Sequence, residues 1–186
     1  MSKTTIPAGG LSADSVTTAK IADDAVTAAK AGFSAGKVLQ MVNSHDANKA
    51  STTNTSFTKL HTSSSITPSA TSSKILVMIT TSAGNDVSAG SGSNANFRII
   101  RTVSSSDTFV GSDPIYNRYG RGDGDDGYAT DLFSYIIEDS PSTTSAVTYS
   151  IAGKKIDGSA EPFVGGRAED TAYQYGTRFT LLEIGA

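Results

Sequence analysis

The most constraining feature of this sequence is a tandem repeat of ten residues near its start. LSADSVTTAK at residues 11–20 is followed directly by IADDAVTAAK at residues 21–30, and five of the ten aligned positions are identical. The large apolar residues recur every five positions, at Leu11, Val16, Ile21 and Val26. Steps of about 100° per residue spread such positions around a whole helix, and an odd spacing puts them on both faces of a strand. We therefore expect this segment to be stable only when several copies surround a common axis.

Each ten-residue unit also carries the signals of a short helical turn. Asp14 and Asp24 stand where an N-cap accepts backbone N–H groups, and Lys20 and Lys30 stand where a cation favours a helix end. Turns this short lie far below the ~12–15 residues that an isolated helix needs. We expect residues 11–31 to form a homo-oligomeric stalk. The alternative is a flexible tether rich in Ala and Thr.

The sequence on either side of the repeat predicts the domain organisation. Residues 1–10 are polar, with one proline and a glycine pair, which is typical of a peptide that becomes ordered on docking to another protein. Two glycines in residues 32–36 let the chain change direction. We expect an attachment peptide at 1–10, the stalk at 11–31, a hinge at 32–36 and a globular head at 37–186.

From residue 37 onward the apolar pattern is that of short β-strands. Apolar runs separated by turn-forming residues indicate an antiparallel β-sandwich or jelly roll. The expected strands are residues 37–43, 56–62, 75–79, 96–104, 128–140, 145–156 and 177–186. Residues 107–127 and 157–176 look irregular. The run at 75–79 is apolar at every position, so we expect one face in the core and regard the other as a candidate subunit interface.

Composition excludes several classes of function. The net charge is −3 and no basic run is longer than Lys154-Lys155, so we expect no nucleic-acid partner. There is no cysteine, which rules out disulfides, thiolate metal sites and a cysteine nucleophile. No segment has the apolar length of a signal peptide or a membrane helix, so we expect a soluble protein made in a cytoplasm, without membrane insertion.

Two motifs that are associated with enzymes occur here in the wrong context. Residues 32–36 match G-x-S-x-G around Ser34, but in serine hydrolases this motif joins a strand to a helix, whereas here the expected stalk precedes it and a strand follows. The histidines available as bases are His45 and His61. Residues 122–127 match G-x-G-x-x-G, but three aspartates there would repel the phosphates of a dinucleotide. We therefore expect no catalytic residues and no cofactor.

The same acidic segment is a weak candidate for a cation site. Asp123, Asp125 and Asp126 offer the hard oxygen ligands that calcium prefers, although the regular spacing of an EF-hand is missing. A solvated acidic turn is the simpler interpretation, and we predict no resident metal.

Aromatic residues next to arginines and asparagine suggest two sugar-binding surfaces, because a ring can pack on the face of a pyranose while polar neighbours bind its hydroxyls. The first segment contains Tyr116, Asn117, Arg118, Tyr119 and Arg121, and the second contains Arg167, Tyr173 and Tyr175. Tyrosine is also a common anchor for protein partners. The alternative is that these tyrosines pack against a neighbouring subunit.

Several phrases of the sequence, taken in order, resemble fibre proteins of tailed phages, especially marine and cyanobacterial phages. They are IPAGGLSADSVTTAKIADDAVTAAKAG, GKVLQMVNS, SITPSATSSKILVMI, NFRIIR, EDSPSTTSAVTYSIAG and RFTLLEIGA. The resemblance covers nearly the whole chain and implies a homotrimeric virion protein, with a particle-binding N-terminus, a stalk of ten-residue repeats and a C-terminal jelly-roll head. Tail fibres usually have longer stalks than two repeats, so a short spike or a head fibre on the capsid fits the same pattern.

These observations predict a non-enzymatic structural protein on the virion surface. Its expected partners are further copies of itself in a homotrimer, tail or capsid proteins bound through its N-terminus, and a polysaccharide or receptor on the host surface. A capsid decoration protein with a structural or weakly adhesive role is the main alternative. A phage-borne depolymerase or esterase is a further one, although the sequence offers no recognisable carboxylate pair or activated nucleophile.

Overall fold

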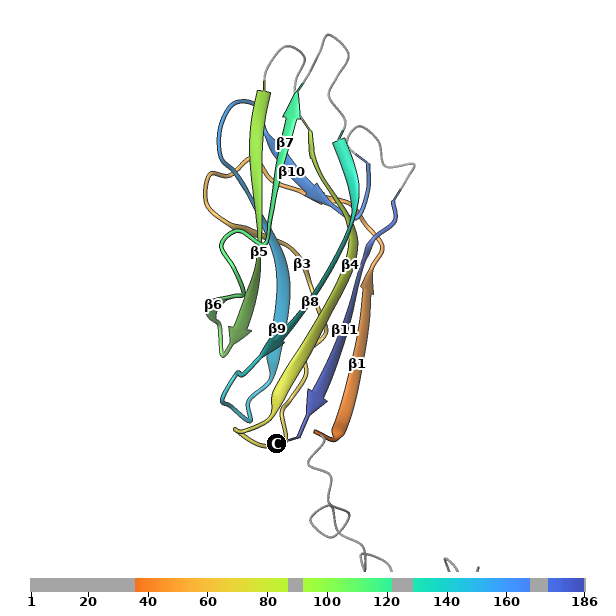
Figure 1. The fold of residues 1–186 in the computed structure, drawn as a ribbon, viewed down its shortest axis with the longest axis vertical. Helices are drawn as coiled ribbons and strands as arrows, with labels where there is room; N and C mark the ends of the chain where they lie inside the picture. Colours follow the sequence, from red (N-terminus) through yellow and green to blue (C-terminus); the bar gives the residue numbers. More distant parts are fainter. Residues whose placement is uncertain (1–35, 87–91, 122–128, 168–173, 186) are drawn as a thin grey trace, which may run out of the picture. The chain divides into compact units, whose positions relative to one another are not determined.

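The structure, a computed structural model, describes residues 36–86, 92–121, 129–167 and 174–185. The expected attachment peptide, the repeat stalk and the hinge up to residue 35 lie outside the described residues. The described residues form eleven β-strands and no helix (Figure 1). The strands are β1 (Val38–Asp46), β2 (Ala50–Ser51), β3 (Thr58–Thr62), β4 (Lys74–Asp86), β5 (Gly92–Val103), β6 (Ser106–Val110), β7 (Tyr116–Arg121), β8 (Ala129–Asp139), β9 (Val147–Lys155), β10 (Glu161–Val164) and β11 (Thr177–Ile184). Accordingly, this part of the chain contains no helix with the length and apolarity to span a membrane.

The strands form two antiparallel sheets. Sheet A has the order β1-β11-β4-β8, with β10 taking over from β11 along the second half of β4 and pairing in turn with the short β2. Sheet B has the order β3-β9-β5, and both β7 and β6 then pair with β5, along its first and second halves. The two sheets lie face to face in Figure 1.

The connection order is that of a jelly roll. If the short strands β2, β6 and β10 are set aside, sheet A contains the first, eighth, third and sixth of the remaining strands, in that order across the sheet. Sheet B contains the second, seventh, fourth and fifth. Two four-stranded sheets that share the chain in this way are the double Greek key of a jelly roll. The expectation of a mainly β, antiparallel sandwich is therefore confirmed for the described residues.

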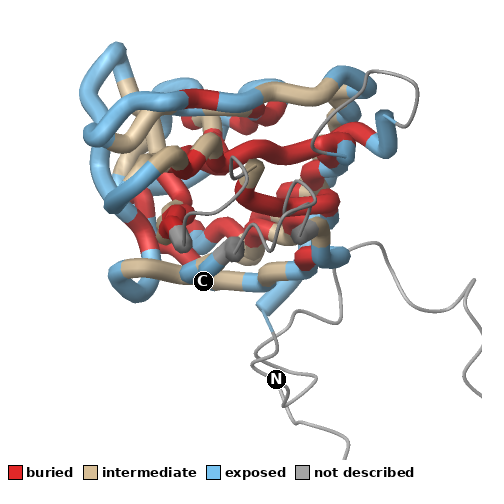
Figure 2. The backbone as a smooth tube through the Cα atoms, turned by 90° about the horizontal axis from the view of Figure 1, so that it is seen from above, coloured by how far each residue is buried: buried red, intermediate tan, exposed pale blue. Residues whose placement is uncertain are grey.

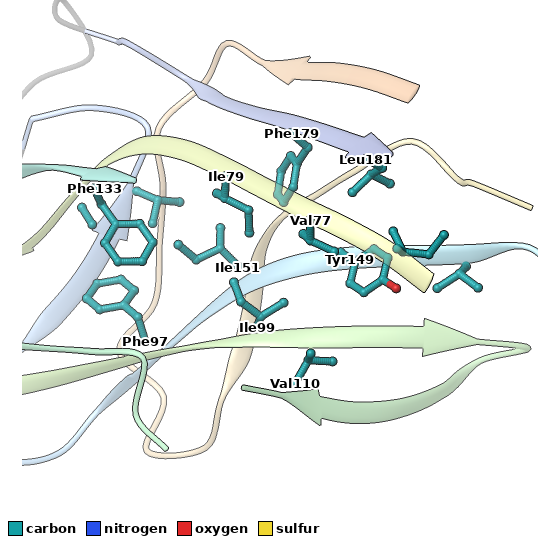
Figure 3. Close-up of a cluster of buried hydrophobic side chains, with 14 of the residues drawn as sticks. Val77, Ile79, Phe97, Ile99, Val110, Phe133, Tyr149, Ile151, Phe179 and Leu181 are labelled. Atoms are coloured by element: carbon teal, nitrogen blue, oxygen red, sulfur yellow. The ribbon is translucent and has the colours of Figure 1, made fainter. Parts of the chain in front are cut away.

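A single apolar core fills the space between the sheets. Buried residues gather in the middle of the sandwich in Figure 2. Inward-pointing residues of β4, β5, β9 and β11 provide most of the core (Figure 3). Its largest fully buried side chains include Tyr149, Phe97 and Phe179. In β4, Ile75, Val77 and Ile79 are fully buried, whereas Leu76 and Met78 lie on the outer face and are half-buried. This run is thus apolar on both faces, as its sequence predicts.

A largely buried ionic cluster joins the two sheets. Asp139 of β8 accepts hydrogen bonds from Arg101 Nη1, at 2.7 and 2.9 Å, and from the Tyr149 hydroxyl, at 2.7 Å. Arg101 and Tyr149 belong to β5 and β9 of sheet B, so the cluster ties sheet A to sheet B. Burial, together with the bond to Asp139, raises the pKa of Tyr149 and keeps its hydroxyl a donor.

A second buried charge lies on the inner face of β11. The Glu183 side chain is fully buried. Its carboxylate accepts hydrogen bonds from Ser69 N at 2.7 Å, from Ser69 Oγ at 2.6 Å and from Gln40 Nε2 at 2.6 Å. Burial alone would raise the pKa of this carboxyl, but the donors outweigh it and lower that pKa from 4.5 to about 2. Glu183 is therefore ionised within the sandwich over the usual pH range.

Residues 107–127 are not irregular, so the expectation from sequence is wrong for the described part of this region. It contains most of β6 and all of β7. The chain turns from β5 into β6 through Ser104 and Ser105, whose φ angles are 47° and 66°. Two successive residues with positive φ are the geometry of a type I′ hairpin, which usually carries Asn-Gly. Residues 157–176 likewise contain a strand, β10.

Different strand ends lie at the two ends of the sandwich. At one end, here named the proximal end, the described chain begins, and Val38 of β1 pairs with Ile184 of β11 (Figure 1). The opposite, distal end contains the end of β4, the end of β7 and the start of β8, where Asn85 pairs with Ala129. The first described strand, β1, therefore starts at the proximal end.

Candidate functional site

A hollow of about 300 Å³ opens on the outer face of sheet A. It lies at the junction between two strands that pair with the same edge of β4. β11 pairs with β4 as far as Thr81, and β10 takes over at Ala83. The hollow is lined by Thr80, Thr81, Ser82, Thr130, Leu132, Tyr175, Gly176 and Arg178. Tyr175 is 62% exposed and Leu132 is 82% exposed, so both present much of their side chains to solvent.

The backbone before β11 holds Tyr175 at this place. The N–H groups of Tyr175 and Gly176 both donate to the Gly165 carbonyl, each at 2.8 Å. Gly176 has a φ of +70°, and a Cβ there would collide with the Asp46 carbonyl and with His45 Nε2. Because this position requires glycine, the chain direction at Tyr175 is fixed by the fold.

Other lining residues come from outward positions of neighbouring strands. Thr80 of β4 pairs with Arg178 of β11 on one side and with Ser134 of β8 on the other. Ser82 pairs with Leu132 two positions further along. Directly paired residues of an antiparallel sheet project to the same face, so strand register brings these side chains together.

The hollow combines an open aromatic ring, an aliphatic side chain, a cation and several hydroxyls. Tyr175 and Leu132 can pack against the C–H face of a pyranose, while Arg178 and Thr80 can bind hydroxyl or carboxylate groups. The buried Thr130 hydroxyl has no hydrogen-bond partner among the described residues and lines the same hollow. A volume of about 300 Å³ lies at the lower limit of ligand sites and suits one ring of a longer sugar chain.

β7 divides the first predicted sugar-binding segment between two faces. Tyr116 points inward, and its ring lies between Phe97 and Phe133, with centroid distances of 5.7 and 5.4 Å. Its hydroxyl donates to Asp131 Oδ2 at 2.5 Å, and Arg118 Nη1 lies 3.1 Å from the same oxygen. Burial, then the bond to Asp131, raises the pKa of Tyr116 to about 12. Tyr116 and Arg118 therefore connect the two sheets, and the Tyr116 ring is not the open stacking surface that we expected.

The other members of that segment lie on sheet B. Asn117 and Tyr119 occupy the outward positions of β7, where Asn117 Nδ2 donates to Asn96 Oδ1 and Tyr119 is exposed. Arg121 is the last residue of β7, at the distal end. These residues are on the opposite sheet from the hollow, so the structure does not join the two predicted segments into one surface.

Of the second predicted segment, Tyr175 lines the hollow, and Arg167 is exposed in the connection that precedes it. Tyr173 lies outside the described residues. The same holds for the candidate calcium ligands Asp123, Asp125 and Asp126, for Ser34, and for the stalk residues Leu11, Val16, Ile21 and Val26.

His61 belongs to a buried polar line at the inner side of β11. Its Nδ1 lies 2.6 Å from Thr177 Oγ1, which is 2.7 Å from Thr81 Oγ1, and its Nε2 lies 3.8 Å from Asp46 Oδ2. Burial lowers the pKa of His61, and the nearby Asp46 opposes this only in part. An Asp–His–Thr line has the residue types of a nucleophilic triad, but Thr177 is fully buried, so its hydroxyl is closed to a substrate. The line satisfies buried polar groups.

Of the residues that line the hollow, sequence reasoning found Tyr175 and missed the others, among them Thr80, Thr130, Leu132 and Arg178. The available signal is weak: Arg178 and Thr80 stand at outward positions of strands whose other face is apolar, and Leu132 is a large apolar residue at an outward position. That these three positions are neighbours depends on the pairing of β4 with β8 and β11.

Comparison with known proteins shows no family for this chain. No known protein family and no curated protein matches the sequence. Among solved structures, a chain from the "Structure of infectious bursal disease virus Gt strain" is similar, with 13% identity and a TM-score of 0.35. The match covers 81% of this chain and 38% of that chain, so the chain spans well under half the length of the viral protein that it resembles.

Proposed function

We propose that the protein is a non-enzymatic structural protein of a phage virion, a homotrimeric fibre or spike attached through its N-terminus. Its jelly-roll head contacts a polysaccharide or other receptor on the host surface, and the hollow around Tyr175 is the contact site. The trimer uses the ten-residue repeats as a stalk, and the partners of the N-terminus are tail or capsid proteins. No cofactor, metal or nucleic acid takes part.

The observation that carries this proposal is where the hollow lies relative to the start of the head. The head begins at the proximal end, where Val38 pairs with Ile184. The hollow lies on the outer face of sheet A, around the last β11–β4 pair, Thr177 with Thr81, and so at the opposite end of this pairing from Ile184. A head held through the residues that precede Val38 therefore presents the hollow away from its attachment. This arrangement suits a protein whose one end is anchored and whose other end meets a surface.

The attachment site on the particle separates a tail fibre or spike from the alternative, a head fibre or decoration protein. Electron microscopy of virions, with gold-labelled antibody against the head, would locate the protein. Label on the tail supports the fibre or spike, and label on the capsid supports the alternative. Absence from purified particles that contain the other structural proteins would refute both.

Binding of the full-length protein to immobilised bacterial lipopolysaccharides and capsular polysaccharides tests the role of the hollow. We expect Tyr175→Ala to weaken binding about fivefold to a hundredfold, because an aromatic anchor at a binding site contributes roughly 1–3 kcal/mol. Tyr175→Phe keeps the ring and should keep most of the binding. Tyr119→Ala is the matched control, since Tyr119 is similarly exposed but lies on sheet B.

Equal loss of binding in Tyr175→Ala and Tyr119→Ala would refute the assignment of the hollow. A well-folded oligomer that binds none of the polysaccharides or host cells would refute the receptor-binding role itself. Shortened polysaccharide chains after incubation would refute the non-enzymatic assignment.

A further inference from the structure

The outer face of sheet A is apolar on the proximal side of the hollow. A polar row of paired residues, Ser134, Thr80, Arg178 and His45, crosses the sheet next to the hollow. Beyond that row, towards the proximal end, most outward positions are apolar, and we name these apolar residues the apolar face: Val38, Leu39, Met41, Leu76, Met78, Ile136, Leu182 and Ile184. The polar outward positions among them are Asn43 and Thr180, which are hydrogen-bonded to each other, and Lys74 and Glu138. Met41 and Ile136 are 60% and 58% exposed. Four strands thus present a mostly apolar surface to solvent.

Strand pairing shows that these residues touch one another across the sheet. Leu76 pairs with Leu182, which in turn pairs with Met41. Met78 pairs with Ile136 on the other side of β4. Soluble monomers seldom expose contiguous apolar patches of this kind, because leaving the area in contact with water is costly. The arrangement indicates that something covers this face.

The edge of sheet A next to this face is also open. Among the described strands, β8 pairs only with β4, so one side of its 11 residues carries no strand partner. Long edge strands with exposed apolar side chains are liable to aggregate unless another element covers them. Leu132 and Ile136 of β8 are exposed, and the described part of this strand has no proline or lysine to block pairing.

We propose that the apolar face is the contact between copies of this chain, so that a second copy is its occupant. Charge favours this choice. On the outer face of sheet A, on the proximal side of the polar row, two described residues are charged, Lys74 and Glu138. They form an ion pair with each other, at 2.6 Å. Two identical surfaces can therefore meet without repulsion between like charges, and depletion of charge is typical of the core of subunit interfaces.

The place of the face in the sequence favours the same occupant. Val38, Leu39 and Met41 are among the first strand residues of the head, and they follow the segment that contains the ten-residue repeats. If the repeats hold several copies together, the heads are present at a high local concentration, which favours contact between them. The inference rests on the proposed oligomeric function, and it assigns the head surface through which the copies meet.

Cysteine labelling tests whether the face is covered. The chain has no cysteine, so Ile136→Cys and Tyr119→Cys each create a single thiol in the full-length protein. In the single chain the two positions are almost equally exposed, at 58% and 54%. If the face is covered, maleimide should react with Cys at 136 about tenfold or more slowly than at 119, because interface cores exclude water. Each rate is divided by the rate of the same variant in denaturant, which corrects for intrinsic thiol reactivity.

Photo-crosslinking identifies the occupant. The chain has three methionines, and two of them, Met41 and Met78, lie on the apolar face. Photo-methionine incorporated in their place should give covalent products at twice or three times the chain mass of 19.1 kDa. Peptide mapping should locate the links at residues 41 and 78, and peptides that contain residue 1 report the N-terminus separately.

Slow labelling at 136 together with links between chains from 41 and 78 supports the proposal. Equal normalised rates at 136 and 119 overturn it, and so does protection at 136 with links only within one chain. A trimer in light scattering with rapid labelling at 136 overturns this inference but not the proposed function. The repeats would then hold the copies together without the apolar face. The polysaccharide-binding and particle-attachment assays test the proposed function independently.

Discussion

The strongest stability prediction concerns Glu183, a fully buried carboxylate whose three hydrogen-bond donors come from Ser69 and Gln40. In the folded protein its pKa is about 2, against 4.5 for an ordinary glutamate. A depressed folded-state pKa contributes stability that is fully present above the unfolded pKa and is lost as the pH falls towards the folded one. At ~1.4 kcal/mol per pH unit, the contribution is about 3 kcal/mol above pH 5. It should disappear between about pH 5 and pH 2.

Glu183→Gln removes the charge and leaves an amide of nearly the same shape. The amide oxygen can still accept from Ser69, but the amide nitrogen then faces Gln40 Nε2, which is a donor. We expect a loss of about 2–4 kcal/mol in the free energy of unfolding at pH 7, because charge-assisted hydrogen bonds are lost and one donor is left unpaired. The decline of stability between pH 5 and pH 2 should also become shallower.

Urea denaturation at a series of pH values measures both effects. The chain has no tryptophan, so far-ultraviolet circular dichroism and tyrosine fluorescence are suitable signals. Protein concentration has to be held constant, since association changes apparent stability. Glu138→Gln is the control, because Glu138 is exposed and its ion pair with Lys74 should contribute no more than about 1 kcal/mol. A Glu183→Gln variant within about 0.5 kcal/mol of the parent, with the same pH dependence, would refute the reasoning.

Three further changes test other features of the fold by the same denaturation assay. Asp139→Asn should lower the free energy of unfolding by about 3–5 kcal/mol, because it leaves the partly buried guanidinium of Arg101 without its counter-charge. A loss below about 1 kcal/mol would contradict the role of the ionic cluster that joins the sheets. Ser104→Asn combined with Ser105→Gly should stabilise the protein by about 1 kcal/mol, since Asn and Gly tolerate the positive φ of this turn better than Ser; no gain would show that the turn is not strained. Gly176→Ala should cost more than about 2 kcal/mol, through its φ of +70° and the collision with the Asp46 carbonyl; a neutral effect would mean that the backbone before β11 is free to move.

The sequence predicts the strands that are buried on one face or on both. Expected strands coincide with β1, β3, β4, β5, β8, β9 and β11, all of which line or cover the core. Their apolar residues recur with a period of two or form one short run, and such patterns depend on the strand itself, not on its neighbours. The apolar run of β4 also predicts a strand that is apolar on both faces, as the structure shows.

The strands that the sequence does not predict are β2, β6, β7 and β10, which are short and show no clear apolar alternation. In β6 only Val110 is buried, and its turn from β5 carries Ser104 and Ser105 in place of the Asn-Gly pair that marks a type I′ hairpin. β10 has four residues and begins next to a glycine-containing turn. These segments are strands because β5 and β4 offer them paired partners, which is information that a local pattern does not contain.

The candidate site illustrates the same limit. Tyr116 and Tyr175 look alike in the sequence, as tyrosines near arginine and other polar residues. Tyr116 occupies an inward position of a strand and packs between two phenylalanines, whereas Tyr175 precedes a strand and stays exposed. A shift of one residue in a strand exchanges the two faces of a sheet, so the side on which a residue lies is fixed by register and not by composition. Arg178 and Thr80 join Tyr175 only through that register.

The pairing of β1 with β11 also determines how the head bears mechanical load. β1 starts at the proximal end and runs along β11 from the Val38–Ile184 pair to the Asp46–Thr177 pair. A pull on the chain before Val38, resisted by a surface held at the distal end, acts along the strand direction. The hydrogen bonds of an antiparallel pair are perpendicular to the strands, so such a pull loads them together in shear instead of opening them one after another. The first strand of the head is thus tethered in the orientation that resists extraction best.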